Sequence, residues 1–189
     1  ILFVLAAFAL VFAFLFCSLI LQAELPPYGS KMYKTFFVWN ENRKLDWNDF
    51  QGKAIANASE AAMTASSIEF SYAVKGNEIT WIVTPKYYPK ISWSKKNMQS
   101  AYVLKHEQLH FDITELYARL FRQRLFENVK SAKDIEKLKK ISKLIIEEWQ
   151  QEENDYDKET NHSIDEKKQA EWNLNVEERL NNLKEFTTR

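Results

Sequence analysis

The hydrophobic pattern divides the chain into an apolar N-terminal run and a longer mixed remainder. Residues 1–21 are almost unbroken apolar sequence, long enough to span a bilayer. Because no polar face interrupts it, this run is typical of an export signal or a membrane anchor rather than of an amphipathic core helix. The sequence therefore predicts a signal peptide or N-terminal anchor over residues 1–23, a linker over 24–34, and one extracytoplasmic domain over 35–189.

Alternating apolar and polar positions predict a β-hairpin in the first half of this domain. A turn signal at residues 75–78 is followed by a returning strand at 79–83. The strand before the turn is recognised by apolar residues at every second position, which is the period of a half-buried strand. These residues are Ile68, Phe70, Tyr72 and Val74.

Weaker β signals surround the hairpin. Residues 35–39 have strand composition, and residues 45–52, which mix large aromatics with acids, are typical of a packed loop or short turn. Pro85 and Pro89 each lack an N–H donor, so residues 85–93 are expected to form at best an edge strand or an extended rim.

Three helices are expected after the hairpin, which makes the domain an α+β fold with a small antiparallel sheet packed on one long helix. That long helix covers residues 97–128, which contain no Gly or Pro, and Ser94 is its expected N-terminal cap. The expected starts of the other two are the capping pairs Ser131/Asp134 and Ser163/Glu166. Their core-facing stripes are Ile135, Leu138, Ile141, Leu144, Ile145 and Trp149, and then Trp172, Val176, Leu180 and Leu183.

The long helix carries His106, Glu107 and His110 in the spacing HExxH. Histidines four residues apart on a helix project from one side, so their imidazoles can share one Zn²⁺ while the glutamate reaches a metal-bound water. Zinc lowers the pKa of that water from about 16 to about 7, and a carboxylate can take its proton as it attacks a carbonyl. The spacing therefore predicts a zinc site with Glu107 as general base.

A catalytic zinc usually has three protein ligands and one open position. His162 is the only histidine outside the motif, and we expect it to be the third ligand. In the same loop, Asp157 could orient a ligating histidine and Tyr156 could donate to a developing oxyanion. The main rivals of His162 are Glu147, Glu148 and Glu152. Together with Glu153 they form an acidic cluster that is otherwise expected to be a solvated face.

Glu115 lies almost diametrically across the long helix from His106, so one straight helix cannot present both to a single metal ion. Glu115 and Arg119 are instead expected to form an exposed or partly buried ion pair one turn apart.

Composition restricts the function classes further. Lys plus Arg and Asp plus Glu both number 26, so the chain lacks the basic excess of a nucleic-acid-binding protein. The one cysteine, Cys17, lies in the apolar run behind Phe16, where a lipoprotein signal would need a small residue. The domain itself has no cysteine, so its stability must come from core packing, to which a bound metal could add.

Three blocks in order resemble a bacterial domain-of-unknown-function family described as predicted secreted zinc-dependent proteases. They are residues 45–52, residues 106–112 with Glu115, Ala118 and Arg119, and the set Tyr156, Asp157, Thr160 and His162. The resemblance covers roughly residues 45–185 and implies an export signal and a zincin-like site. Ser163 departs from the family, in which a glycine is expected after the histidine.

These signals predict an exported zinc-dependent peptidase acting on a peptide or protein, with Glu107 and Tyr156 as catalytic residues and His106, His110 and His162 as metal ligands. An extended substrate is expected to pair with a sheet edge at residues 79–88. Membrane contact is expected only through the N-terminal segment. Two alternatives remain: an envelope binding protein with a structural zinc or a degenerate site, and a zinc amidase acting on a cell-wall linkage.

Overall fold

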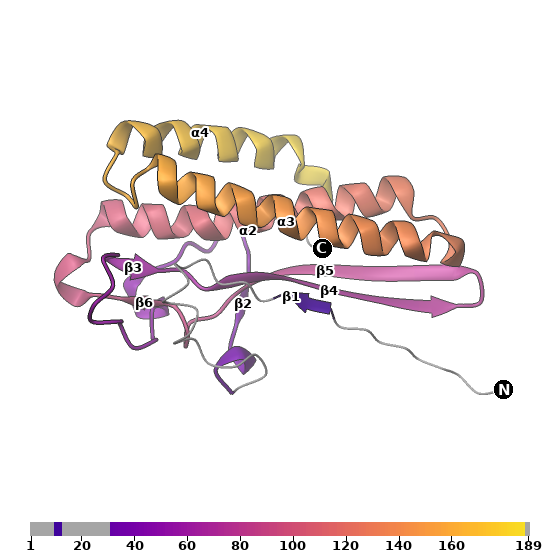
Figure 1. Ribbon diagram of the computed structural model, residues 1–189, viewed down its shortest axis with the longest axis horizontal. Coiled ribbons are helices and arrows are strands. Elements are labelled where there is room, and N and C mark those ends of the chain that lie inside the picture. Colours follow the sequence, from indigo (N-terminus) through magenta and orange to yellow (C-terminus); the bar gives the residue numbers. More distant parts are fainter. Residues whose placement is uncertain (1–9, 13–30, 188–189) are drawn as a thin grey trace.

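The computed structural model describes residues 10–12 and 31–187, in which antiparallel strands lie beneath three helices (Figure 1). The strands are β1 (Leu10–Phe12), β2 (Phe37–Val38), β3 (Ala62–Met63), β4 (Ser66–Lys75), β5 (Glu78–Tyr87) and β6 (Trp93–Ser94). The helices are α2 (Ala101–Asn128), α3 (Ile135–Glu159) and α4 (Glu166–Asn182). The prediction of an α+β domain with small antiparallel sheets and three helices is confirmed.

The predicted N-terminal signal or anchor lies outside the described residues, except for β1, which pairs with β4. Most of the predicted linker lies outside them too, and its last residues, Lys31–Lys34, form a 3-10 turn. Within the described part of the chain, no helix is long and apolar enough to cross a membrane.

The predicted hairpin of β4 and β5 is the centre of a sheet with the order β1-β4-β5-β2, while β3 pairs with β6 in a separate two-stranded sheet. The turn contains Gly76 at a φ of 62°, a conformation that glycine adopts without strain. The returning strand runs through Pro85 to Tyr87, so the expectation that it stops at 83 was wrong. The C=O of Pro85 accepts a hydrogen bond from Trp39 on the β2 side, so its missing N–H costs no bond to β4.

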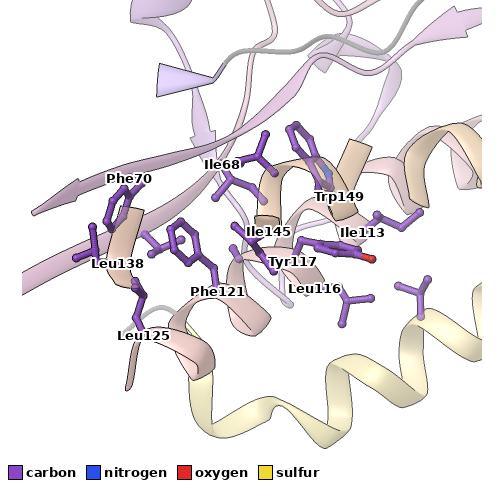
Figure 2. Close-up of a cluster of buried hydrophobic side chains, with 14 of the residues drawn as sticks. Ile68, Phe70, Ile113, Leu116, Tyr117, Phe121, Leu125, Leu138, Ile145 and Trp149 are labelled. Carbon is purple, nitrogen blue, oxygen red and sulfur yellow. The ribbon is translucent and has the colours of Figure 1, made fainter. Parts of the chain in front are cut away.

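The main core lies between the inner face of the hairpin and helices α2 and α3 (Figure 2). Phe70 from β4 packs on Phe121 from α2, with ring centroids 4.8 Å apart. The apolar stripe predicted for α3 is confirmed by its fully buried members Leu138, Ile145 and Trp149, whereas Leu144 is exposed. In α4, Val176 is buried and Trp172 and Leu180 are partly buried against the same core, as is Leu183 directly after the helix.

Helix starts were predicted less well than helix positions. Ser131 and Asp134 form the expected capping box, on the 3-10 turn that leads into α3. Ser94, however, lies in β6, and α2 is capped by Ser100, whose hydroxyl accepts from the N–H of Val103. The cap of α4 is Asp165 rather than Ser163.

Helix α2 is buried on almost every side, because it contacts the hairpin as well as α3 and α4. Glu115 therefore has no solvent exposure, and it accepts a 2.7 Å hydrogen bond from Arg119. The predicted pair is confirmed, but its predicted exposure was wrong, since α4 covers this face and Arg119 also donates to the C=O of Leu180. Removing one partner of such a buried pair typically costs about 3–5 kcal/mol.

Candidate metal centre

A cleft of about 450 Å³ opens between β3, α2, α3 and the loop between α3 and α4. It is lined by His106, Glu107 and His110 of α2, by Asp157 of α3, and by His162 of the loop. Four segments that are distant in sequence therefore meet at the histidine motif.

Three possible ligand atoms converge in this cleft. The Nε2 atoms of His106 and His110 lie 3.2 Å apart, and Oδ1 of Asp157 lies 3.2 Å from each of them. Within the described part of the chain, these residues form the one group of three histidine, cysteine, aspartate or glutamate side chains that could hold a metal ion.

The triangle fits a tetrahedral zinc ion. With metal–ligand distances of about 2.0–2.1 Å, the corners of a tetrahedron lie about 3.3–3.4 Å apart, close to the spacing seen here. The donor set of two imidazole nitrogens and one carboxylate oxygen also suits zinc. When both Nε2 atoms are unprotonated, their lone pairs and the carboxylate oxygen converge on one point, an arrangement that a bound cation would stabilise.

The other ring nitrogens of the two histidines are held by buried acceptors. His106 Nδ1 lies 2.8 Å from Oε1 of Gln169, and His110 Nδ1 lies 2.5 Å from Oε2 of Glu153. A side-chain carbonyl or carboxylate oxygen accepts the Nδ1 hydrogen and so leaves the Nε2 lone pair directed at the cleft. Both rings are therefore fixed in the orientation and tautomer that metal binding needs.

Burial sets the protonation behaviour of the carboxylates. Burial raises the pKa of Glu107 and outweighs the opposing effect of His110 and His106. For Asp157, burial acts in the same direction, but in the metal-free protein the charge of protonated His110 and hydrogen bonds from His106 and His110 hold its pKa well below the usual range. Asp157 is thus kept as an anion, the form that binds metal.

Glu107 is 4% exposed and forms part of the cleft wall beside the two histidines. The hydroxyl of Thr64, which follows β3, lies 2.8 Å from its Oε2 and donates to it. A carboxylate held in this way next to a metal position has the geometry that the sequence predicted for a general base.

The third-ligand prediction has a different outcome for each candidate. Asp157, expected only to orient a histidine, itself joins the ligand triangle. His162 lies at the cleft wall with Nδ1 3.6 Å from Oδ1 of Asp157 and its side chain 52% exposed, outside that triangle, so its ligand role stays a prediction. The rival glutamates do not line the cleft: Glu147 is exposed, Glu148 pairs with Arg124 and Glu152 pairs with Arg179.

The oxyanion role predicted for Tyr156 does not agree with its position. The side chain has no exposure, and its hydroxyl lies 3.1 Å from the C=O of His106 and 2.8 Å from Oε1 of Gln169. Its ring stacks on His106 with centroids 4.6 Å apart. Tyr156, which belongs to α3, therefore packs against His106 and helps to hold its imidazole in place.

Sequence reasoning missed Glu153, Gln169 and Thr64. Glu153 is 2% exposed, although the acidic run around it suggested a solvated face. One signal was present, because Glu153 lies four residues after Trp149 and so continues the apolar stripe of α3. The other two residues had no local signal, since their roles depend on how distant segments pack.

The predicted substrate edge at residues 79–88 does not reach the cleft, and β3 does. The physical reason is that β5 crosses the middle of the hairpin sheet, paired to β4 along its length and to β2 at its end. The strand beside the motif comes instead from residues 62–63, a segment whose sequence was ambiguous.

Residues 83–163 match the model of a family described as "Bacterial protein of unknown function (DUF922)". The resemblance to a bacterial family of unknown function is thereby confirmed over a segment that includes all three members of the ligand triangle. Among curated proteins and solved structures, no match to the chain was found.

Proposed function

We propose that this protein is a zinc-dependent peptidase with a zincin-like site, in which His106, His110 and Asp157 hold Zn²⁺ and Glu107 is the general base. The observation that supports this most strongly is the ligand triangle itself, with sides of 3.2 Å and a buried carboxylate beside it in an open cleft.

When bound, Zn²⁺ would supply Lewis-acid chemistry, lowering the pKa of water and polarising a carbonyl. Residues of the protein would carry out proton transfer and hold the zinc ligands in place. Glu107 would take the proton of the attacking water and later return it to the leaving amine, while Thr64 holds the carboxylate in place. Glu153 and Gln169 keep the two imidazoles aligned through their Nδ1 atoms.

The edge of β3 offers a binding surface for an extended peptide. Lys95 directly follows β6, and its N–H donates to the C=O of Ala61, which directly precedes β3. Ala61 and Lys95 are therefore a hydrogen-bonded pair of the two-stranded sheet. Pair types alternate along antiparallel strands, so the N–H and C=O of Ala62 point away from β6. Because Ala62 and Thr64 both line the cleft, a substrate strand added at this edge would cross the metal position.

The two alternatives differ in what they require of the site. A structural zinc would need a closed set of four protein ligands, whereas the group in the described residues has three and faces an open cleft. Hydrolysis of a non-peptide amide uses the same residues, so a cell-wall linkage is the second substrate class to screen. Export through the N-terminal segment remains part of the proposal.

The test is Glu107→Gln in the full chain, with zinc content and hydrolysis of an unstructured protein such as casein measured together. We expect zinc to be retained and hydrolysis to fall by at least about 100-fold, the usual contribution of a general base. Glu127→Gln, at an exposed position of the same helix, is the control and should change neither quantity. Full activity of the Glu107 variant would refute the mechanism.

A further inference from the structure

The cleft is lined by one further histidine, His162, which is not part of the ligand triangle. His162 lies in the loop between α3 and α4, its side chain is half exposed, and it lines the same cleft as Glu107. Since the hydroxyl of Tyr156 is buried behind His106, the site as described lacks the predicted donor for the carbonyl oxygen under attack. Among the donor side chains that line the cleft, His162 has a ring nitrogen 3.6 Å from the ligand oxygen of Asp157.

We propose that His162 is a further catalytic residue, which donates an imidazole N–H hydrogen bond to the substrate carbonyl oxygen and stabilises the negative charge that develops there, without ligating the metal. This inference rests on the proposed peptidase function and assigns to His162 a role different from the one its sequence position predicts.

The loop backbone holds this ring in place. Asn161, His162 and Ser163 have φ values of 47°, 51° and 72°, three consecutive non-glycine residues in the left-handed region. The turn is closed at both ends: the N–H of His162 donates to the C=O of Asp157 at 2.9 Å, and that of Asp165 donates to Thr160 at 2.8 Å. This strained, hydrogen-bonded turn fixes the backbone at His162, whose side chain lines the cleft.

The distance of His162 from the ligand triangle favours a role as hydrogen-bond donor over a role as metal ligand. A fourth tetrahedral ligand would have to approach the other three to about 3.3–3.4 Å. His162 lies outside the group of atoms found within 4.8 Å of one another. Its Nδ1 is 3.6 Å from Oδ1 of Asp157, an ion-pair distance when the ring is protonated and longer than an ordinary hydrogen bond, so this nitrogen lies beside the ligand triangle. A carbonyl oxygen approaching the metal position would enter that space.

The chemistry needs only a hydrogen bond, with no bond made or broken at His162. A donor aimed at the position where charge develops lowers the barrier because it interacts more strongly with the transition state than with the substrate. Removing one such donor typically lowers kcat by about 100- to 1000-fold. The zinc ligands would be unaffected, which distinguishes this role from ligation.

The decisive variants are His162→Gly and, as the matched control, Ser163→Gly. Both positions have left-handed φ values, so glycine introduces no backbone strain at either and both chains should fold. In the full-length protein, three quantities are measured: the absorption spectrum of bound Co²⁺ used in place of zinc, the kinetics of casein hydrolysis, and the affinity for an N-phosphoryl dipeptide, whose tetrahedral anion imitates the attacked carbonyl.

For His162→Gly we expect an unchanged cobalt spectrum, a kcat lower by about 100-fold with KM little changed, and N-phosphoryl dipeptide binding weaker by a similar factor. His162→Asn, which keeps an N–H donor and tolerates a left-handed φ, should recover part of the loss. A changed cobalt spectrum would make His162 a ligand and overturn the inference, as would unchanged kcat and affinity. If the wild-type protein binds metal but hydrolyses nothing, the proposed peptidase function fails first, and this inference with it.

Discussion

Replacing Glu153 by glutamine should weaken zinc binding or destabilise the metal-free protein, although the two side chains have nearly the same shape. Oε2 of Glu153 lies 2.5 Å from Nδ1 of His110, and Oε1 lies 2.9 Å from Nε1 of Trp149. Both oxygens therefore accept from an N–H group. Glutamine offers one oxygen and one NH₂, so in either orientation of the amide one of the two N–H groups meets another donor.

The size of the effect follows from this geometry. A buried donor that loses its acceptor costs about 1–3 kcal/mol. If the amide places its NH₂ toward His110, the ring loses its orientation and zinc affinity should fall about 10- to 100-fold. If the NH₂ faces Trp149 instead, the cost appears as a lower free energy of unfolding of the metal-free protein. Glu153→Gln must therefore reduce one of these two quantities.

Zinc affinity is measured by competition with a chromogenic chelator, and the free energy of unfolding by urea titration of the metal-free protein. Glu147→Gln is the matched control, because Glu147 lies on the same helix at an exposed position and makes only a surface pair with Lys143. The control should differ from wild type by less than about 0.5 kcal/mol. If Glu153→Gln matches wild type in both quantities, the support assigned to Glu153 is wrong.

Two other substitutions test neighbouring parts of the account. Thr64→Val removes the hydroxyl that donates to Glu107 and should lower kcat by about 10-fold or more, the equivalent of one charged hydrogen bond, while zinc content stays the same; an unchanged kcat would show that the hydroxyl does not position the base. Ser163→Gly relieves a non-glycine φ of 72° and should raise the free energy of unfolding by up to about 1 kcal/mol in urea titrations, whereas a decrease would contradict the strain argument.

The family expectation of glycine after the histidine gains a physical reason here. Ser163 has a φ of 72°, a region that glycine occupies freely and other residues occupy at a cost. The departure noted in the sequence therefore concerns backbone strain in the loop rather than the chemistry of His162.

What could be predicted from the sequence was set by short-range periodicity. The hairpin, the α3 stripe and the histidine motif each repeat with the period of their own element, so they were found without knowledge of tertiary packing. The exposure of Glu115 was mispredicted because α2 lies between the sheet and two helices, an environment that removes the polar face expected of a surface helix.

The residues around the two histidines were harder to predict, because they are brought together by tertiary packing. Asp157, Glu153 and Gln169 reach the histidines from α3 and α4, and of the three only Glu153 had a signal within its own helix, its spacing of four residues from Trp149. The N-terminal cap of α2 is Ser100 rather than the predicted Ser94, because Ser94 pairs with β3 and the helix begins only after Ser100. Pairing between distant segments overrode local capping preference in this case.

The most direct test of the account is the zinc stoichiometry of the purified full-length protein, compared with Asp157→Asn and His162→Gly. The account predicts about one zinc per wild-type chain, a large loss in the Asp157 variant, and full retention in the His162 variant. Loss of zinc from His162→Gly with retention in Asp157→Asn would reverse the ligand assignment. A folded wild-type protein that binds no zinc would contradict the central claim.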